Sequence, residues 1–269
     1  MGINIEHVIL DFESGMIRAI QALMPQTTIS LCLYHWAAAL YRNLCDRGLK
    51  TAHAANVANL RLFYDCLRAL PLVPSGHMQW AISAVRRLGA TVVSCLSEPN
   101  KSNFISFLTY FDKTYVGDST KLPIFDPILW CHANSHERTS NLCEAFHHTL
   151  NALCNTSTPT FYYVLHVIVD EFDEFARMFS RVEQGDASRR VTSNRKTTEG
   201  TLERAYAATF PEYGGKSWAE TPIRLVDEKY IQYLRSCSAA LERSKAPTKI
   251  AKTKAQQASA PSSGEVFTV

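Results

Sequence analysis

Side chains that could do chemistry stand at the ends of two short apolar runs near the amino terminus. Residues 5–10 are almost continuously apolar and stop at Asp11, and residues 28–33 form a second apolar run that includes Cys32 and leads to His35. The segment between them has helical spacing, and a strand, helix, strand unit of this kind is right-handed with parallel strands. The carboxyl ends of parallel strands meet at one edge of a sheet, so we expect Asp11, Cys32 and His35 to be near neighbours there.

A second set of polar side chains lies on a helix predicted to begin at about Asn141. Asn141, Glu144 and His148 share one face of this helix, and His147 precedes His148. A carboxylate on a helix can join one at a strand end to hold divalent metal, and Mg²⁺ prefers such oxygen ligands to thiolate or imidazole. We therefore expect the carboxylates of Asp11 and Glu144 to lie within about 8 Å, the reach of two ligands around ions about 4 Å apart.

Each of these residues also has a structural explanation. Asp11 is of a type that caps helices, and Asn141 and Glu144 have the spacing of a capping box. Cys32 and His35 have the spacing of half a zinc site. The weak candidates for its other half are Cys131, His132 and His136. We expect Cys32 and His35 to lie at the sheet edge without bound zinc.

Composition and charge exclude some classes of protein. Hydrophobic residues make up 46% of the 269 residues, which is ordinary for a globular protein of one large or two small domains. A formal charge of +3 does not by itself indicate nucleic-acid binding. Eight cysteines without a CxxC pair or a preceding signal peptide favour an intracellular protein. No apolar run approaches the roughly 18 residues of a membrane span, so we expect no membrane partner.

Most of the remaining chain has helical periodicity. Helices are predicted over residues 16–24, 36–49, 56–70, 78–88, 104–115, 141–153, 160–179, 201–208 and 223–241. The expected buried stripe of the helix that carries Glu144 is Leu142, Phe146, Leu150 and Leu153. Residues 184–200 are a predicted polar loop, and the last 26 residues are expected to be disordered.

The ordered motifs resemble the Mutator-like element (MULE) transposases, which are ribonuclease H-like enzymes of the DDE type. The resemblance covers about residues 5–180. The segments that carry it are Ile9-Leu10-Asp11-Phe12-Glu13, Cys32-Leu33-Tyr34-His35, Gly48-Leu49, Arg138-Thr139-Ser140-Asn141 and Glu144-Ala145-Phe146-His147. Together they are specific, although no single segment would be.

The resemblance implies a site and a reaction. Asp11 and Glu144 would be the second and third catalytic carboxylates and would ligate Mg²⁺ or Mn²⁺, and Cys32 and His35 would be the family's CxxH pair. His35 would contact the scissile phosphate, and Asn141 and His147 belong to the motif around Glu144. The implied partner is DNA, with a possible homo-oligomer, and the implied location is the nucleus.

This chain also departs from the family pattern. The family's first catalytic aspartate, on an earlier strand of a five-stranded sheet, has no counterpart here, nor has the family's amino-terminal DNA-binding region. We therefore expect a truncated or domesticated transposase core that does not cleave DNA by itself. A non-catalytic host module that binds DNA or protein is the main alternative, and an unrelated helical scaffold is the third.

The predicted fold class is α/β and predominantly helical: a partial ribonuclease H-like core, built on a parallel βαβ unit, with a large all-helical insertion. The strand at residues 5–10 would have one unpaired side, which favours a poorly soluble or oligomeric chain. The predicted organisation is a partial core over 1–36, the helical insertion over 37–120, a return to the core over 121–183, a polar loop over 184–200, carboxy-terminal helices over 201–243 and a disordered tail over 244–269.

Overall fold

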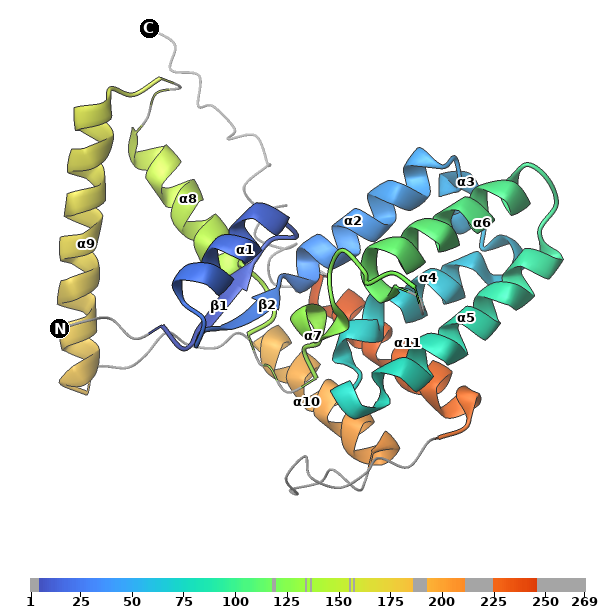
Figure 1. Ribbon diagram of the computed structural model, residues 1–269. Helices are drawn as coiled ribbons and strands as arrows, with labels where there is room; N and C mark the ends of the chain where they lie inside the picture. Colours follow the sequence, from blue (N-terminus) through green and yellow to red (C-terminus); the bar gives the residue numbers. More distant parts are fainter. Residues whose placement is uncertain are drawn as a thin grey trace, which may run out of the picture.

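The computed structural model describes residues 5–117, 120–133, 135, 137–154, 156, 158–185, 193–210 and 225–245. The described chain is mostly helical, with one small sheet (Figure 1). The expected disordered tail lies outside the described residues from 246 onward. The predicted loop over 184–200 is described only at its two ends, and its second end is helical because α10 (Ser193–Thr209) begins there.

The predicted parallel unit is confirmed. Strands β1 (His7–Leu10) and β2 (Thr28–Leu31) pair in parallel and are joined by helix α1 (Ser14–Leu23). The register aligns Leu10 with Leu31, so both strands end at the same level. Whatever follows each strand therefore starts at one edge of the sheet.

The helix after β2 begins earlier than the sequence predicts. Helix α2 spans Leu33–Asp46, so the predicted strand over residues 28–33 ends at Leu31 and His35 lies in the first turn of a helix. The cause is an apolar stripe that starts before the predicted helix does: Leu33 and Trp36 are three residues apart, and both are buried. Cys32 is the N-cap residue of α2.

A helical body packs on one side of the sheet (Figure 1). With α2, it contains α3 (Lys50–Ala54), α4 (Leu60–Ala69), α5 (Met78–Cys95), α6 (Asn100–Phe111), α10 and α11 (Asp227–Lys245). Short helical turns lie at η1 (Val57–Asn59), η2 (Leu70–Leu72), η3 (Ser75–His77) and η4 (Asp112–Val116). Because α11 packs against α4, α5 and α10, distant parts of the chain share one core.

Helix α5 continues through Gly89, where the sequence predicts an end. A Cβ atom at this position would lie 3.0 Å from Cε2 of Phe63, which is closer than side chains normally approach. Gly89 therefore permits the ring of Phe63 on α4 to pack against the backbone of α5. This glycine serves helix packing and not helix termination.

An aromatic cluster joins the sheet to the helical body. The ring of Trp36 stacks on Trp130 of α7 (Pro127–Trp130), with 4.6 Å between centroids, and meets Tyr115 edge-on at 4.7 Å. Phe12, in the turn after β1, contacts the ring of Phe125 at 5.1 Å. The turn that carries Asp11 is therefore held by its neighbouring phenylalanine.

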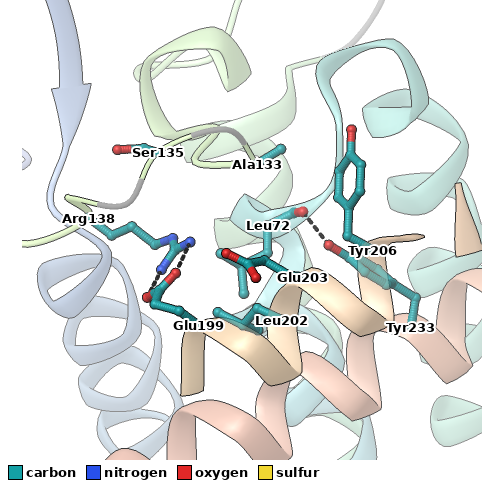
Figure 2. A pocket seen from close by; sticks show the side chains of 9 residues that line it. All are labelled: Leu72, Ala133, Ser135, Arg138, Glu199, Leu202, Glu203, Tyr206 and Tyr233. Atoms are coloured by element: carbon teal, nitrogen blue, oxygen red, sulfur yellow. Dashed lines mark hydrogen bonds and ion pairs between the residues drawn. The ribbon is translucent and has the colours of Figure 1, made fainter. Parts of the chain in front are cut away.

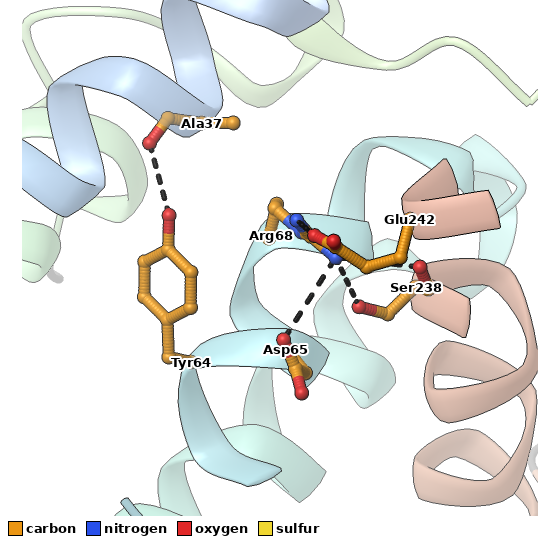
Figure 3. Close-up of polar contacts among 6 residues, drawn as sticks. All are labelled: Ala37, Tyr64, Asp65, Arg68, Ser238 and Glu242. Carbon is orange, nitrogen blue, oxygen red and sulfur yellow. Dashed lines mark hydrogen bonds and ion pairs between the residues drawn. The ribbon is translucent and has the colours of Figure 1, made fainter. Parts of the chain in front are cut away.

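A buried arginine joins α4 to α11 (Figure 3). The guanidinium of Arg68 donates to Glu242 and to the hydroxyl of Ser238, the latter at 2.7 Å, and lies 3.8 Å from the carboxylate of Asp65. A buried charge is stable only with such partners. Burial also raises the pKa of Asp65, although Arg68 opposes that shift.

Helices α8 (Asn141–Cys154) and α9 (Phe161–Glu183) pack against each other on the other side of the sheet from the helical body (Figure 1). The expected buried stripe of α8 is wrong in part, because Phe146 and Leu150 are half-buried and Leu153 is exposed. The side chain of Leu142 lies outside the described residues. On α9 many large apolar side chains are exposed, including Phe172 at 66%.

Replacement of Trp36 by alanine tests the aromatic junction. We expect Trp36→Ala to lower the free energy of unfolding by about 3–5 kcal/mol, because it removes a fully buried indole. Phe172→Ala, which truncates an exposed ring, should change it by less than about 0.5 kcal/mol. Chemical denaturation measures both values, and equal losses would contradict this account of the core.

The open side of β1 and the apolar surface of α9 predict self-association. Within the described residues the sheet contains only β1 and β2, so one side of β1 has no strand partner. We expect the purified chain to elute from a sizing column as oligomer or aggregate, and Phe172→Glu to shift it towards monomer. A monodisperse wild-type monomer would contradict the expectation.

Candidate functional site

The structure brings Asp11, Cys32 and His35 together at the carboxyl edge of the sheet. One possible ligand atom from each of the three side chains lies within 4.8 Å of the other two. Nδ1 of His35 is 2.9 Å from a carboxylate oxygen of Asp11, and these side chains are 32% and 56% exposed. The sulfur of Cys32 is buried. The prediction that these residues are neighbours is confirmed.

Backbone pairing fixes this arrangement. Cys32 N–H donates to the carbonyl of Leu10 at 2.7 Å, which continues the β1–β2 ladder by one residue. Asp11 and Cys32 therefore leave adjacent strand ends, and α2 places His35 one turn later. Asp11 is not the helix cap considered from the sequence, because Glu13 occupies that position before α1.

The segment before α8 docks on the same edge. The carbonyl of Arg138 accepts from the N–H of Leu33 at 2.7 Å. Ser140 donates from both its N–H and its hydroxyl to the sulfur of Cys32, each at 3.4 Å. Segments more than 100 residues apart in the sequence are thus joined by hydrogen bonds at this site.

Arg138 itself turns towards helix α10 (Figure 2). Its guanidinium forms two hydrogen bonds with the carboxylate of Glu199, at 2.6 and 3.0 Å. The pair lines a cavity of about 350 Å³ that also includes Leu202, Tyr206 and Tyr233. In this chain the arginine of the motif holds the docked segment against the helical body.

Glu144 lies in the first turn of α8 and lines a cleft of about 560 Å³ with Tyr34, Asn141 and Arg68. The capping box considered for it is off by one residue: the N–H of Glu144 donates to the carbonyl of Ser140, so Ser140 and not Asn141 precedes the helix. Glu144 is not one of the donors grouped around Asp11. Convergence of the Asp11 and Glu144 carboxylates within about 8 Å stays a prediction.

The two histidines of α8 are on its exposed surface. His147 has its ring 6.3 Å from the ring of Phe146, and His148 is exposed beside it. Asn141 is also exposed, at the rim of the cleft. Among these motif residues, Asn141 is the one that shares the cleft of Glu144.

Cys131 and His132 have structural partners. The thiol of Cys131 donates to the carbonyl of Val73 at 3.4 Å, and Nε2 of the buried His132 donates to the carbonyl of Leu31 at 2.6 Å. His132 thereby ties β2 to the segment after α7. Neither belongs to the donor group around Cys32, and His136 lies outside the described residues.

The donors around Asp11 do not match the implied Mg²⁺ or Mn²⁺. Those ions favour several oxygen ligands, whereas the groups nearest to Asp11 are a thiol and an imidazole. Glu144, the other expected carboxylate ligand, is outside that group. Among the described residues, the donors at this edge therefore do not form an oxygen cage for a pair of hard ions.

Sequence reasoning missed two contributors to the site. Ser140 donates to Cys32, and the half-exposed ring of Tyr34 lies edge-on to the ring of His35, with 5.4 Å between centroids. Tyr34 lies inside the CxxH motif, so the sequence itself indicates that it is near the site. The role of Ser140 depends on a contact across 108 residues, which no local pattern indicates.

Buried His132 predicts a pH dependence of stability. Burial lowers its pKa from 6.5 to about 4 in the folded chain. As the pH falls from 6.5 towards 4, the unfolded chain takes up a proton that the folded chain does not. The free energy of unfolding should therefore fall by up to about 1.4 kcal/mol per pH unit through this residue.

His132→Gln, which keeps an N–H donor for Leu31, should make the decline shallower than in the wild type, and His166→Gln on α9 is the control for loss of an exposed histidine. Denaturation at several pH values between 4 and 7 measures the slopes. Equal slopes in the wild type and His132→Gln would show that His132 does not cause the decline.

The chain was compared with protein-family models, curated proteins and solved structures. No protein-family model, curated protein or solved structure matches the chain. Among the described residues, no helix has both the length and the apolar character needed to cross a membrane.

Proposed function

We propose that this chain is the core of a Mutator-like DNA transposase that has lost, or does not by itself carry, cleavage activity. One observation supports this most strongly. The Asp-Phe-Glu turn, the CxxH pair and the Arg-Thr-Ser-Asn segment meet at one sheet edge, as parts of a single site would. Parallel strands bring the first two together in any such unit, but the third lies more than 100 residues later and docks there without that constraint.

The finer parts of the proposal follow from the same resemblance. The β1–α1–β2 unit is part of a ribonuclease H-like core, and Asp11 and Glu144 stand at its second and third carboxylate positions. DNA is the proposed partner and the nucleus the proposed location. The proposed binding face is the cleft beside Tyr34 and Glu144, next to the donor group at Asp11.

The absence of cleavage follows from the ligands that the chain supplies. Among the described residues, the donor atoms grouped with Asp11 are one imidazole nitrogen and one thiol sulfur. A two-metal mechanism requires oxygen ligands that hold both ions. The proposed role of this chain is therefore to bind DNA.

A protein-binding module is the second candidate. The observation that favours it is the exposed apolar surface of α9, which includes Phe161, Phe172 and Phe179. Large exposed apolar patches are typical of sites that bind other proteins. Surfaces that bind DNA are more polar and more positively charged.

Binding to duplex DNA, measured by fluorescence anisotropy, separates these functions. We expect binding that weakens as salt is added, because phosphate contacts release counterions. Glu144→Gln should tighten binding about threefold, since unit charges about 7 Å apart in water repel by ~0.6 kcal/mol. Glu98→Gln is the control, because Glu98 is exposed in the loop between α5 and α6. Figure 1 shows that this loop lies at the end of the helical body away from the sheet.

The outcomes distinguish the candidates. Equal effects of Glu144→Gln and Glu98→Gln, or no salt-dependent binding, would remove the DNA proposal and favour the protein-binding module. Incubation with DNA and Mg²⁺ or Mn²⁺ should give no cleavage. Cleavage that Glu144→Gln abolishes would show that the chain is an active nuclease.

A further inference from the structure

The three side chains at the sheet edge are a mixed set of metal donors. They offer one thiol, one imidazole nitrogen and one carboxylate, with one atom from each inside a 4.8 Å limit. In a tetrahedral zinc site, bonds of 2.0–2.3 Å place the ligand atoms about 3.3–3.8 Å apart. Small side-chain movements would bring the three donors to that spacing.

The backbone holds these donors before any ion binds. The β1–β2 register sets Asp11 against Cys32, and Cys32 N–H bonds to Leu10 at 2.7 Å. His35 is in the first turn of α2, whose stripe is anchored by buried Trp36. Binding an ion would thus require little ordering of the chain.

The hydrogen bonding of His35 and of Cys32 also agrees with a role as metal ligands. Within the described part of the chain, the buried Nδ1 of His35 forms no hydrogen bond of regular geometry, and its polar neighbour is Oδ1 of Asp11 at 2.9 Å. The sulfur of Cys32 accepts two hydrogen bonds from Ser140. Hydrogen bonds from residues that do not themselves bind the metal orient the ligands of metal sites. A buried nitrogen without a hydrogen bond costs free energy, and a bound ion would remove that cost.

We propose that Asp11, Cys32 and His35 bind one zinc-class divalent ion. Thiolate and imidazole select such ions over Mg²⁺, which agrees with the poor fit of the hard ions to this edge. Three protein ligands leave one coordination position for water, and Asp11 is 56% exposed, so solvent can reach the site. This reverses our expectation from the sequence of a pair without zinc.

Coordination replaces the thiol hydrogen of Cys32 by the ion and releases that proton to solvent. The site is the one assigned to the proposed function, but the binding of an ion does not depend on DNA. Its measurement therefore remains informative whatever the DNA experiments give.

Titration of the full chain with Co²⁺, after treatment with a chelator, tests the proposal. We expect a thiolate-to-cobalt absorption band that saturates at one equivalent and is displaced by Zn²⁺. Cys32→Ser should abolish the band, and Ser140→Ala should weaken binding about 10- to 100-fold. Cys95→Ser, which removes an exposed thiol outside the group, is the control and should keep the band.

Cys32 is buried, so its variant could fail to fold. His35→Gln, at a partly exposed position, provides the second variant, and circular dichroism confirms that each protein is folded. The proposal is wrong if the folded wild type gives no band at one equivalent, or if His35→Gln binds as the wild type does. Salt-dependent DNA binding without this band would remove the metal site and leave the proposed function standing.

Discussion

The pairing of Leu10 with Leu31 is the constraint on which the rest of the site depends. It ends two parallel strands at one level, so Asp11 and Cys32 leave the sheet side by side. A shift of one residue would turn each side chain of β2 to the opposite face. The contact of Phe12 with Phe125 and the stack of Trp36 on Trp130 then hold the two departing segments on the helical body.

Much of the local structure was visible in the sequence. The apolar runs before Asp11 and His35 gave the parallel unit, because strand length and periodicity are local properties. The start of α2 was misplaced because Leu33 fits a strand and a helix equally well, and its packing with the core decides between them. Gly89 was misread for a similar reason, since only the neighbouring Phe63 explains why a glycine stands inside α5.

The site was less predictable than the elements that carry it. Chain order brought Asp11, Cys32 and His35 together correctly, but it gave no information on Ser140 or on the side to which Arg138 turns. The arginine pairs with Glu199, a residue in a segment predicted to be a polar loop. Contacts of this kind depend on how helices far apart in the sequence pack, and single-sequence patterns do not contain that information.

The hydrogen bonds between Cys32 and Ser140 imply an order of assembly for the nascent chain. The strands are synthesised first, but Cys32 lacks its hydrogen bonds from Ser140 until 108 more residues have been added. The ion pair of Arg138 with Glu199 forms only after α10 has been added as well. Contacts between such distant segments are slow to form, because a long loop must close before they stabilise the fold. A ribosome that stalled before α10 would therefore expose a chain whose sheet edge lacks the Arg138–Glu199 ion pair. Chaperones that bind such a chain would bind it before the site at this edge has formed.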